Sequence, residues 1–201
     1  VTANGQDLSL TLSTEDRTFN ISSFVDVAIT AGGLDQTVNV SFVADGSASV
    51  SFNEYREQVQ AIQNTIDQLR ADYAGSAATV NVQLVQFSSG ASGANYDLFD
   101  STLDDVRSGT PLNPYQDGGS TNYDAALSAA SSFFAGKGAE DNFLLFASDG
   151  NPNTGGSFTD EVTELNGNNV SITAVGFGTG ISLGTLNQID NTGGAQIVIK
   201  G

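Results

Sequence analysis

The sequence contains no histidine, cysteine, methionine or tryptophan. It therefore offers no imidazole base, no thiolate nucleophile, no thiolate zinc site and no disulfide. Any metal ion that the protein binds must be held by oxygen atoms. The absence of cysteine is compatible with oxidising and with reducing surroundings, so it does not fix the compartment.

Basic residues are scarce as well. The chain of 201 residues has 6 Lys and Arg against 23 Asp and Glu, which gives a formal net charge of −17. Nucleic-acid binding depends on clustered Lys and Arg, so this balance argues against nucleic acid as a partner, and it argues against an anionic membrane surface too. A solvated acidic surface that keeps the protein soluble is the simplest explanation of the excess.

Long hydrophobic runs are also missing. No run approaches the roughly 20 apolar residues that span a bilayer, so we expect no membrane insertion. The first residues, VTANGQDLSLTLS, lack the basic and then apolar layout of a signal peptide. We expect the sequence to be one module of a larger multidomain chain.

Apolar runs and helical patterns alternate from residue 37 onward. The patterns predict strands at 37–44, 79–87, 142–148, 170–177 and 195–200, and helices at 51–73, 121–135, around 158–165 and at 182–190. In the first helix Ser51 and Glu54 form a capping box. Residues 88–119 are expected to form a long polar loop. The alternation predicts an α/β fold, with a doubly wound, mostly parallel sheet flanked by helices on both faces.

Residues 1–36 break this rhythm. Two strand-like segments, 8–12 and 19–30, follow one another with no helical pattern between them. They predict a short N-terminal β appendage, either a β-hairpin or the end of a preceding β-rich module. The α/β domain is expected to occupy residues 37–201.

Polar oxygen-bearing residues follow two of the predicted strands and precede one predicted helix. Asp45, Ser47 and Ser49 follow the first strand, Thr121 precedes a helix, and Asp149 closes a buried strand. Each has a simpler explanation by itself: a chance D-x-S-x-S match, a helix N-cap and an ordinary turn. A parallel sheet brings such strand ends to one edge, and together they favour a metal site.

These motifs resemble the metal-ion-dependent adhesion site of von Willebrand factor type A domains. The resemblance rests on D-x-S-x-S after a first strand, G-G-x-T-N before a helix and S-D-G after a buried strand, and it covers about residues 37–201. It implies the Rossmann-like fold of that family. The segments GGSTNYDAAL and SDGNPN, with the acidic and cysteine-free composition, further resemble the A domains of very large bacterial RTX adhesins.

The resemblance implies that one divalent cation is surrounded, directly or through water, by Asp45, Ser47, Ser49, Thr121 and Asp149. It also implies that a carboxylate of the partner completes the coordination. Two mild departures are Ala48, where the family often has Gly, and Ser148, where it often has Thr. Hydroxyl and carboxylate oxygens suit Mg²⁺ or Ca²⁺, and the choice between them stays open. Two carboxylates only balance the ion's charge, which leaves it attractive to a third.

Further acidic residues lie in the long loop. Additional structural Ca²⁺ is a second expectation for Asp97, Asp100, Asp104, Asp105 and Asp117, with plain solvated loop chemistry as the simpler alternative. Asn151 and Asn153, next to Asp149, either line the ligand face or form turns.

Three functions compete for this pattern. The first is an extracellular, cell-surface adhesion module that captures a protein or surface ligand through an acidic group. The second is a structural spacer in which the metal only stabilises the fold. The third, metal-assisted hydrolysis, lacks a candidate acid or base once both aspartates hold the ion, so we expect no enzyme. Dinucleotide binding by GFGTG at 176–180 is weaker, because the third glycine spacing is missing.

Overall fold

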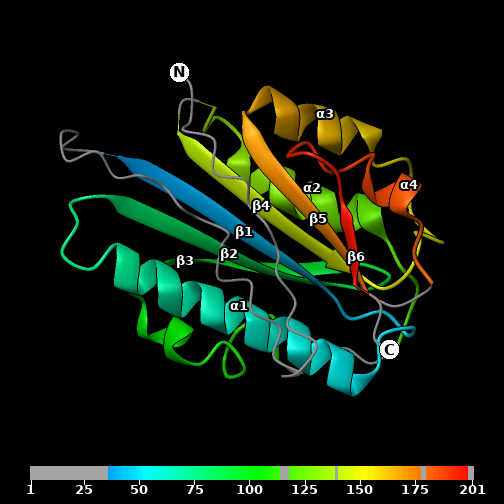
Figure 1. Cartoon of the computed structure of the whole chain (residues 1–201), viewed down its shortest axis with the longest axis horizontal. Coiled ribbons are helices and arrows are strands. Elements are labelled where there is room, and N and C mark those ends of the chain that lie inside the picture. The colour runs from blue at the N-terminus through cyan, green and yellow to red at the C-terminus, as the bar shows by residue number, and fades with distance from the viewer. Residues whose placement is uncertain (1–35, 114–117, 139, 178–179, 199–201) are drawn as a thin grey trace.

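The computed structural model describes residues 36–113, 118–138, 140–177 and 180–198, and it is built around a six-stranded sheet (Figure 1). The strands are β1 (Thr37–Asp45), β2 (Thr79–Phe87), β3 (Ala91–Asp97), β4 (Asp141–Ser148), β5 (Val170–Phe177) and β6 (Gln196–Val198). Their spatial order is β3-β2-β1-β4-β5-β6. Every neighbouring pair is parallel except β2 and β3. The predicted mostly parallel sheet is confirmed.

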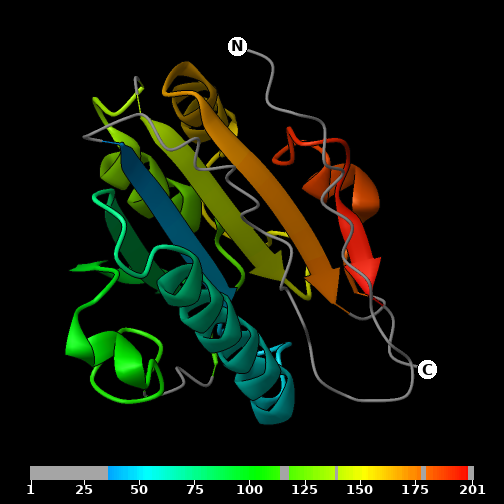
Figure 2. The same ribbon diagram turned by 60° about the vertical axis from the view of Figure 1, so that its left-hand side comes forward.

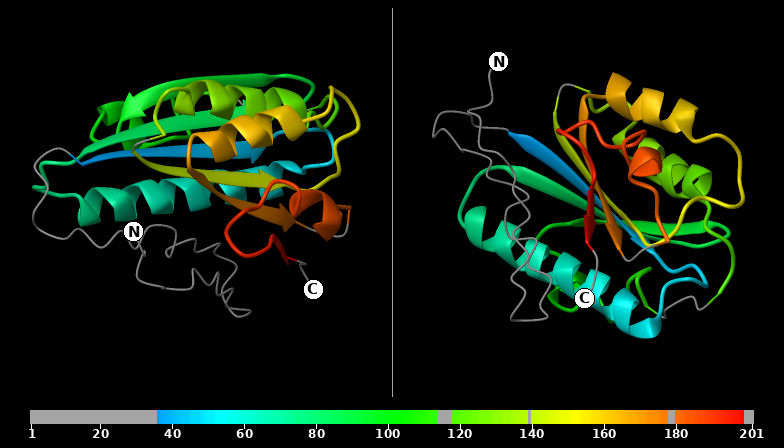
Figure 3. Two further views of the ribbon diagram at one scale, coloured as in Figure 1. Left: turned by 90° about the horizontal axis from the view of Figure 1, so that it is seen from above. Right: turned by 45° about the vertical axis from the view of Figure 1, so that its right-hand side comes forward.

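Helices cover both faces of the sheet, as predicted (Figures 2 and 3). They are α1 (Phe52–Asp72), the 3₁₀ helix η1 (Ser101–Asp104), α2 (Tyr123–Phe134), α3 (Thr159–Gly167) and α4 (Leu183–Leu186). On one face, α1 packs Ile62 and Ile66 against β1 residues such as Phe42. On the other face, α2, α3 and α4 share a second core with Phe146 of β4. The crossovers leave every parallel strand end at one edge.

The start of α1 follows the predicted capping box. The Ser51 hydroxyl accepts the backbone N–H of Glu54 at 3.3 Å, and the Glu54 carboxylate accepts the backbone N–H of Ser51 at 2.9 Å. Two of the N–H groups that a helix start leaves unpaired are thereby satisfied. The cap fixes the start of α1 at Phe52, three residues after the D-x-S-x-S motif.

The polar loop expected at 88–119 is wrong in its first part, because residues 91–97 form β3. This strand, ASGANYD, is an antiparallel edge strand whose only half-buried side chains are Ala94 and Tyr96. Small polar side chains give almost no period-two signal. The ladder to β2 therefore stabilises the strand mainly through backbone hydrogen bonds, which the sequence pattern does not reveal.

Element ends differ from the expectation in smaller ways. Helix α2 begins at Tyr123 and α4 spans only Leu183–Leu186. The β appendage predicted for 1–36 lies outside the described residues, apart from Gln36. Among the helices of the described part, none combines the length and the apolar character needed to cross a bilayer.

Candidate metal centre

The five predicted ligands lie together at the carboxyl edge of the sheet. Thr121 Oγ1 donates to Ser47 Oγ at 3.2 Å, Ser47 Oγ lies 3.2 Å from Ser49 Oγ, and Ser49 Oγ donates to Asp149 Oδ1 at 2.7 Å. The backbone N–H of Ser47 donates to Asp45 Oδ1 at 2.8 Å. Segments 74 and 100 residues apart in sequence thus share one cluster of oxygen atoms.

Neighbouring elements hold the first loop at both ends. The side-chain amide of Gln58 in α1 accepts the backbone N–H of Asp45 at 3.1 Å and donates to the Asp45 carbonyl at 3.2 Å. Gly46 N–H donates to the carbonyl of Phe87 in β2, and Ala48 N–H donates to the carbonyl of Gly119. The end of β1 is therefore fixed before any ligand arrives. Sequence reasoning missed Gln58, which reads as one more polar helix position.

Ser148 also contributes more than a small replacement for threonine. Its hydroxyl donates to Asp45 Oδ2 at 2.5 Å and lies 3.0 Å from the Gly150 carbonyl. Asp45 therefore receives one hydrogen bond on each carboxylate oxygen, from Ser47 and from Ser148. These contacts hold the carboxylate in one orientation.

The alternative explanation of Thr121 as a helix N-cap is wrong. Asn122 caps α2, because its Oδ1 accepts the backbone N–H of Ala125 at 3.0 Å. The Thr121 hydroxyl is therefore turned to Ser47 instead. Its backbone is held by Asn153, which accepts the Thr121 N–H at 2.9 Å through Oδ1 and donates its own N–H to the Thr121 carbonyl at 3.0 Å.

Asn151 and Asn153 connect the loop after β4 to two other segments. Asn153 makes the contacts with Thr121 described above, and Asn151 Oδ1 accepts the backbone N–H of Ser182, ahead of α4, at 2.9 Å. Their role is thus more than local turn formation. Both side chains brace the loop that carries Asp149.

The donor set fits a hard divalent cation. Two carboxylates and three hydroxyls supply only oxygen atoms, as Mg²⁺ and Ca²⁺ require. Gly150 leaves space beside them: a Cβ at this position would lie 3.4 Å from Ser49 Oγ and 3.7 Å from Thr121 Oγ1. Asp45, Ser47 and Thr121 are buried, whereas Ser49 is exposed and Asp149 is half-buried. The site is thus buried on the side of Asp45, Ser47 and Thr121, and it is open to solvent on the side of Ser49 and Asp149.

The ionised carboxylates of Asp45 and Asp149 destabilise the folded protein when no metal is bound. Desolvation raises the pKa of the Asp45 carboxyl although hydrogen bonds from Ser148 and Ser47 oppose the shift. Desolvation also raises the pKa of Asp149, and the negative charges of Asp45 and Glu54 add to the effect, against the hydrogen bond from Ser49. A divalent ion between the two carboxylates would remove this penalty.

Metal binding should therefore weaken as the pH falls. A raised pKa in the folded state means that ionised Asp45 and Asp149 destabilise the metal-free protein at neutral pH, and that this penalty disappears as the pH falls through the folded pKa. A bound cation requires the ionised forms. We expect the metal-induced rise in melting temperature to be largest near neutral pH and to shrink as the pH falls through the raised pKa values of these two carboxyls. Differential scanning calorimetry with and without Mg²⁺ measures it, and a metal effect independent of pH would contradict the expectation.

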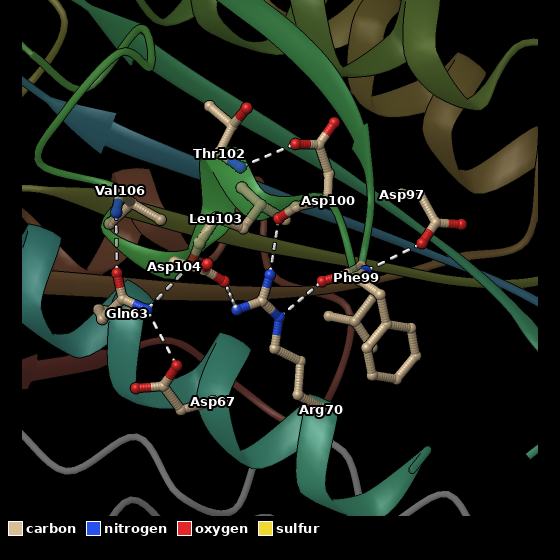
Figure 4. Close-up of polar contacts among 11 residues, drawn as sticks. Gln63, Asp67, Arg70, Asp97, Phe99, Asp100, Thr102, Leu103, Asp104 and Val106 are labelled. Carbon is tan, nitrogen blue, oxygen red and sulfur yellow. Dashed lines mark hydrogen bonds and ion pairs between the residues drawn. The ribbon is translucent and has the colours of Figure 1, made fainter. Parts of the chain in front are cut away.

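Arg70 of α1 binds the acidic loop after β3 (Figure 4). Arg70 donates to the carbonyls of Leu98 and Asp100 and pairs with the Asp104 carboxylate, each at 2.7 Å. Asp100 accepts the Thr102 N–H at 2.8 Å. Asp97 accepts the N–H of Phe99 and Asp105 pairs with Arg107.

The expected additional Ca²⁺ gains no support from this loop. Within the described residues no group of three or more acidic side chains is placed to hold a metal ion. Asp117 lies outside the described residues. The simpler alternative, loop chemistry, accounts for the four aspartates whose contacts are given above.

Comparison with known families agrees with this fold. Residues 39–200 match the von Willebrand factor type A domain, so the chain belongs to this family. Domains of the family typically mediate metal-dependent adhesion or ligand binding rather than catalysis. No curated protein matches the sequence.

Several solved structures share the fold at low sequence identity. Proximal thread matrix protein 1 from the mussel byssus carries zinc in its metal-ion-dependent adhesion site (MIDAS) motif. It is 20% identical with a TM-score of 0.66, over 82% of this chain and 44% of that one. The pilus adhesin SpaC from Lactobacillus rhamnosus GG is 15% identical with a TM-score of 0.68, over 82% of this chain and 28% of that one. A von Willebrand factor type A structure from Catenulispora acidiphila is 14% identical with a TM-score of 0.66, over 83% of this chain and 39% of that one. The chain spans less than half of each of these proteins.

Proposed function

We propose that this domain is an extracellular, metal-dependent adhesion module of a larger cell-surface chain. In this proposal Asp45, Ser47, Ser49, Thr121 and Asp149 hold one divalent cation, Mg²⁺ or Ca²⁺. A protein or surface ligand supplies an acidic group to the ion. The observation that carries the proposal is the hydrogen-bonded chain of side-chain oxygens that joins Thr121, through two serines, to Asp149.

The donor set explains why such a site would attract a further anion. Two carboxylates balance the charge of a divalent ion, and the three hydroxyls add ligands without adding charge. The ion supplies the positive charge that an otherwise acidic protein lacks at this edge. Ser49 already directs its proton at Asp149, so a lone pair of its oxygen stays available for coordination.

The relatives support the same function. SpaC is a pilus adhesin, and the mussel byssus protein carries zinc in its MIDAS motif. The byssus protein favours a divalent cation at the site, and a pilus and a byssus thread both favour a place outside the cell. The likeness to RTX adhesins remains a prediction from the sequence motifs.

Synthetic peptides test the proposal directly. We expect a peptide with one glutamate to bind in Mg²⁺ or Ca²⁺, and to lose binding with a chelator or when glutamine replaces glutamate. If the domain were only a spacer, the metal would raise the melting temperature, yet the glutamate and glutamine peptides would behave alike. That second result would overturn the proposal.

Replacing Thr121 tests whether its hydroxyl binds the metal, without disturbing the fold. Thr121→Ala should weaken metal binding by about tenfold or more, whereas Thr121→Ser should keep most of the affinity, because only the former removes a ligand oxygen. Both variants should fold normally, since Asn153 holds the backbone of residue 121. Titration calorimetry measures the affinities. Equal metal binding by the wild type and Thr121→Ala would remove Thr121 from the site.

A further inference from the structure

Strand β3 forms one border of the sheet. It is the last strand in the order β3-β2-β1-β4-β5-β6, so within the described residues only β2 pairs with it (Figure 2). Most of its side chains are exposed, and Tyr96, which is half-buried, packs against the core under α1. An edge strand of this kind leaves a row of backbone N–H and C=O groups without a strand partner.

A hydrogen bond at the end of β3 shows which backbone groups face outward. The Leu98 N–H donates to the Val80 carbonyl at 2.9 Å, which continues the antiparallel ladder between β2 and β3. In such a ladder only every second residue of a strand bonds to a given neighbour. The N–H and C=O groups of Ala91, Gly93 and Asn95 therefore point away from β2. In the described part of the chain no hydrogen bond joins these outward groups to another residue.

The strand also lacks the features that usually block such an edge. Lysine, proline and β-bulges protect many natural edge strands from pairing. The sequence ASGANYD contains neither lysine nor proline, and its seven residues pair one to one with residues 81–87 of β2. The opposite border, β6, has only three described residues. Strand β3 is therefore the edge at which a further strand can be added.

The charge of β3 indicates which kind of strand fits. Its one charged residue is Asp97, at its end, whose exposed carboxylate accepts the Phe99 N–H at 2.9 Å. Among the described residues no basic side chain pairs with Asp97. A second copy of this chain would bring a further net charge of −17, which disfavours self-pairing. A basic residue opposite Asp97 would instead form a favourable cross-strand pair.

We propose that β3 binds an extended, basic polypeptide segment of a partner protein, which adds an antiparallel strand to the sheet. Backbone hydrogen bonds to Ala91, Gly93 and Asn95 supply the affinity. A lysine or arginine of the segment lies opposite Asp97, and a β-branched side chain lies opposite Tyr96 on the other face. The binding depends on backbone groups and on the Asp97 carboxylate, so it needs no metal ion.

A labelled peptide with the sequence Lys-Val-Thr-Val-Thr-Val-Thr tests the inference on the full chain by fluorescence anisotropy in EDTA. In antiparallel pairing its lysine lies opposite Asp97, and its valines lie on the face of Tyr96. We expect saturable binding that added Mg²⁺ does not change. Glutamate in place of the peptide's lysine should weaken binding about fivefold, and Asp97→Asn should remove that difference.

A proline substitution tests whether the outward backbone groups bind the peptide. Asn95→Pro removes an N–H that points away from β2, so the ladder to β2 keeps its hydrogen bonds. It should weaken peptide binding about fivefold or more, whereas Asn95→Ala, which keeps the N–H, should change the affinity less than about twofold. Circular dichroism and the melting temperature show whether both variants fold. If Asn95→Pro does not fold, Ala91→Pro at the first position of β3, with Ala91→Ser as its control, decides in the same way.

The outcomes are independent of the proposed adhesion function. If the peptide fails to bind, or binds equally to the wild type and to the folded proline variant, the inference is wrong and the metal site is unaffected. Peptide binding that requires Mg²⁺ would assign the peptide to the metal centre. Self-association of the chain that Asn95→Pro abolishes would assign the edge to a second copy. Either of these results would also overturn the inference.

Discussion

Asp45→Asn is expected to abolish Mg²⁺ and Ca²⁺ binding and, at neutral pH, to stabilise the metal-free protein. The asparagine Oδ1 can still accept the Ser47 N–H, and its amide can donate to Ser148 Oγ, whose proton can turn to the Gly150 carbonyl 3.0 Å away. The hydrogen bonds with the Ser47 N–H and with Ser148 are thus replaced. The variant lacks only the charge, whose burial raises the pKa of Asp45 and therefore penalises the folded state.

The two effects have opposite signs and can be measured on one sample. Metal affinity should fall by about a hundredfold or more, because a charged ligand becomes neutral. The free energy of unfolding without metal should rise by an amount on the order of 1 kcal/mol. Denaturant titrations with and without metal give both numbers, and Ser148→Ala serves as a control that keeps the carboxylate. A variant that retains tight metal binding, or that unfolds more easily, would contradict the interpretation.

Gly155→Ala should cause a large loss of stability through the loop after β4. Gly155 has a φ of +90°, and a Cβ there would lie within van der Waals overlap of the Asn122 side chain, which caps α2. The substitution adds backbone strain and also displaces the cap. Together these should lower the free energy of unfolding by about 2–4 kcal/mol.

Gly109→Ala is the matched control for this prediction. Gly109 has a φ of +73°, but a Cβ added there would meet nothing within 4 Å. Its cost should be the strain alone, about 1–2 kcal/mol. Chemical denaturation measures both variants. Equal losses for the two positions would show that the contact with Asn122 contributes nothing.

Sequence patterns predict the parts of this protein that depend on local signals. The capping box of Ser51 and Glu54 places the start of α1 within one residue. The apolar runs place β1, β2, β4 and β5, because strands buried on both faces need near-continuous apolar sequence. The family motifs bring out the five oxygen-bearing residues, which the fold then gathers at one edge.

The features that the sequence patterns do not predict depend on contacts between residues far apart in the chain. Strand β3 exists because β2 offers an unpaired edge, while its own residues are mostly small or polar. Asn122 rather than Thr121 caps α2, and the Thr121 backbone is held instead by Asn153, 32 residues away. Gln58 and Ser148 support Asp45 through contacts that only the packed structure reveals.

Metal uptake by the purified chain tests the central claim most directly. Titration calorimetry of the metal-free protein with Mg²⁺ and then with Ca²⁺ should show binding of one divalent ion per chain, and the heat should vanish in Asp45→Asn. A titration without binding heat for either ion, supported by an unchanged melting temperature, would contradict the account. So would uptake that persists undiminished in the variant.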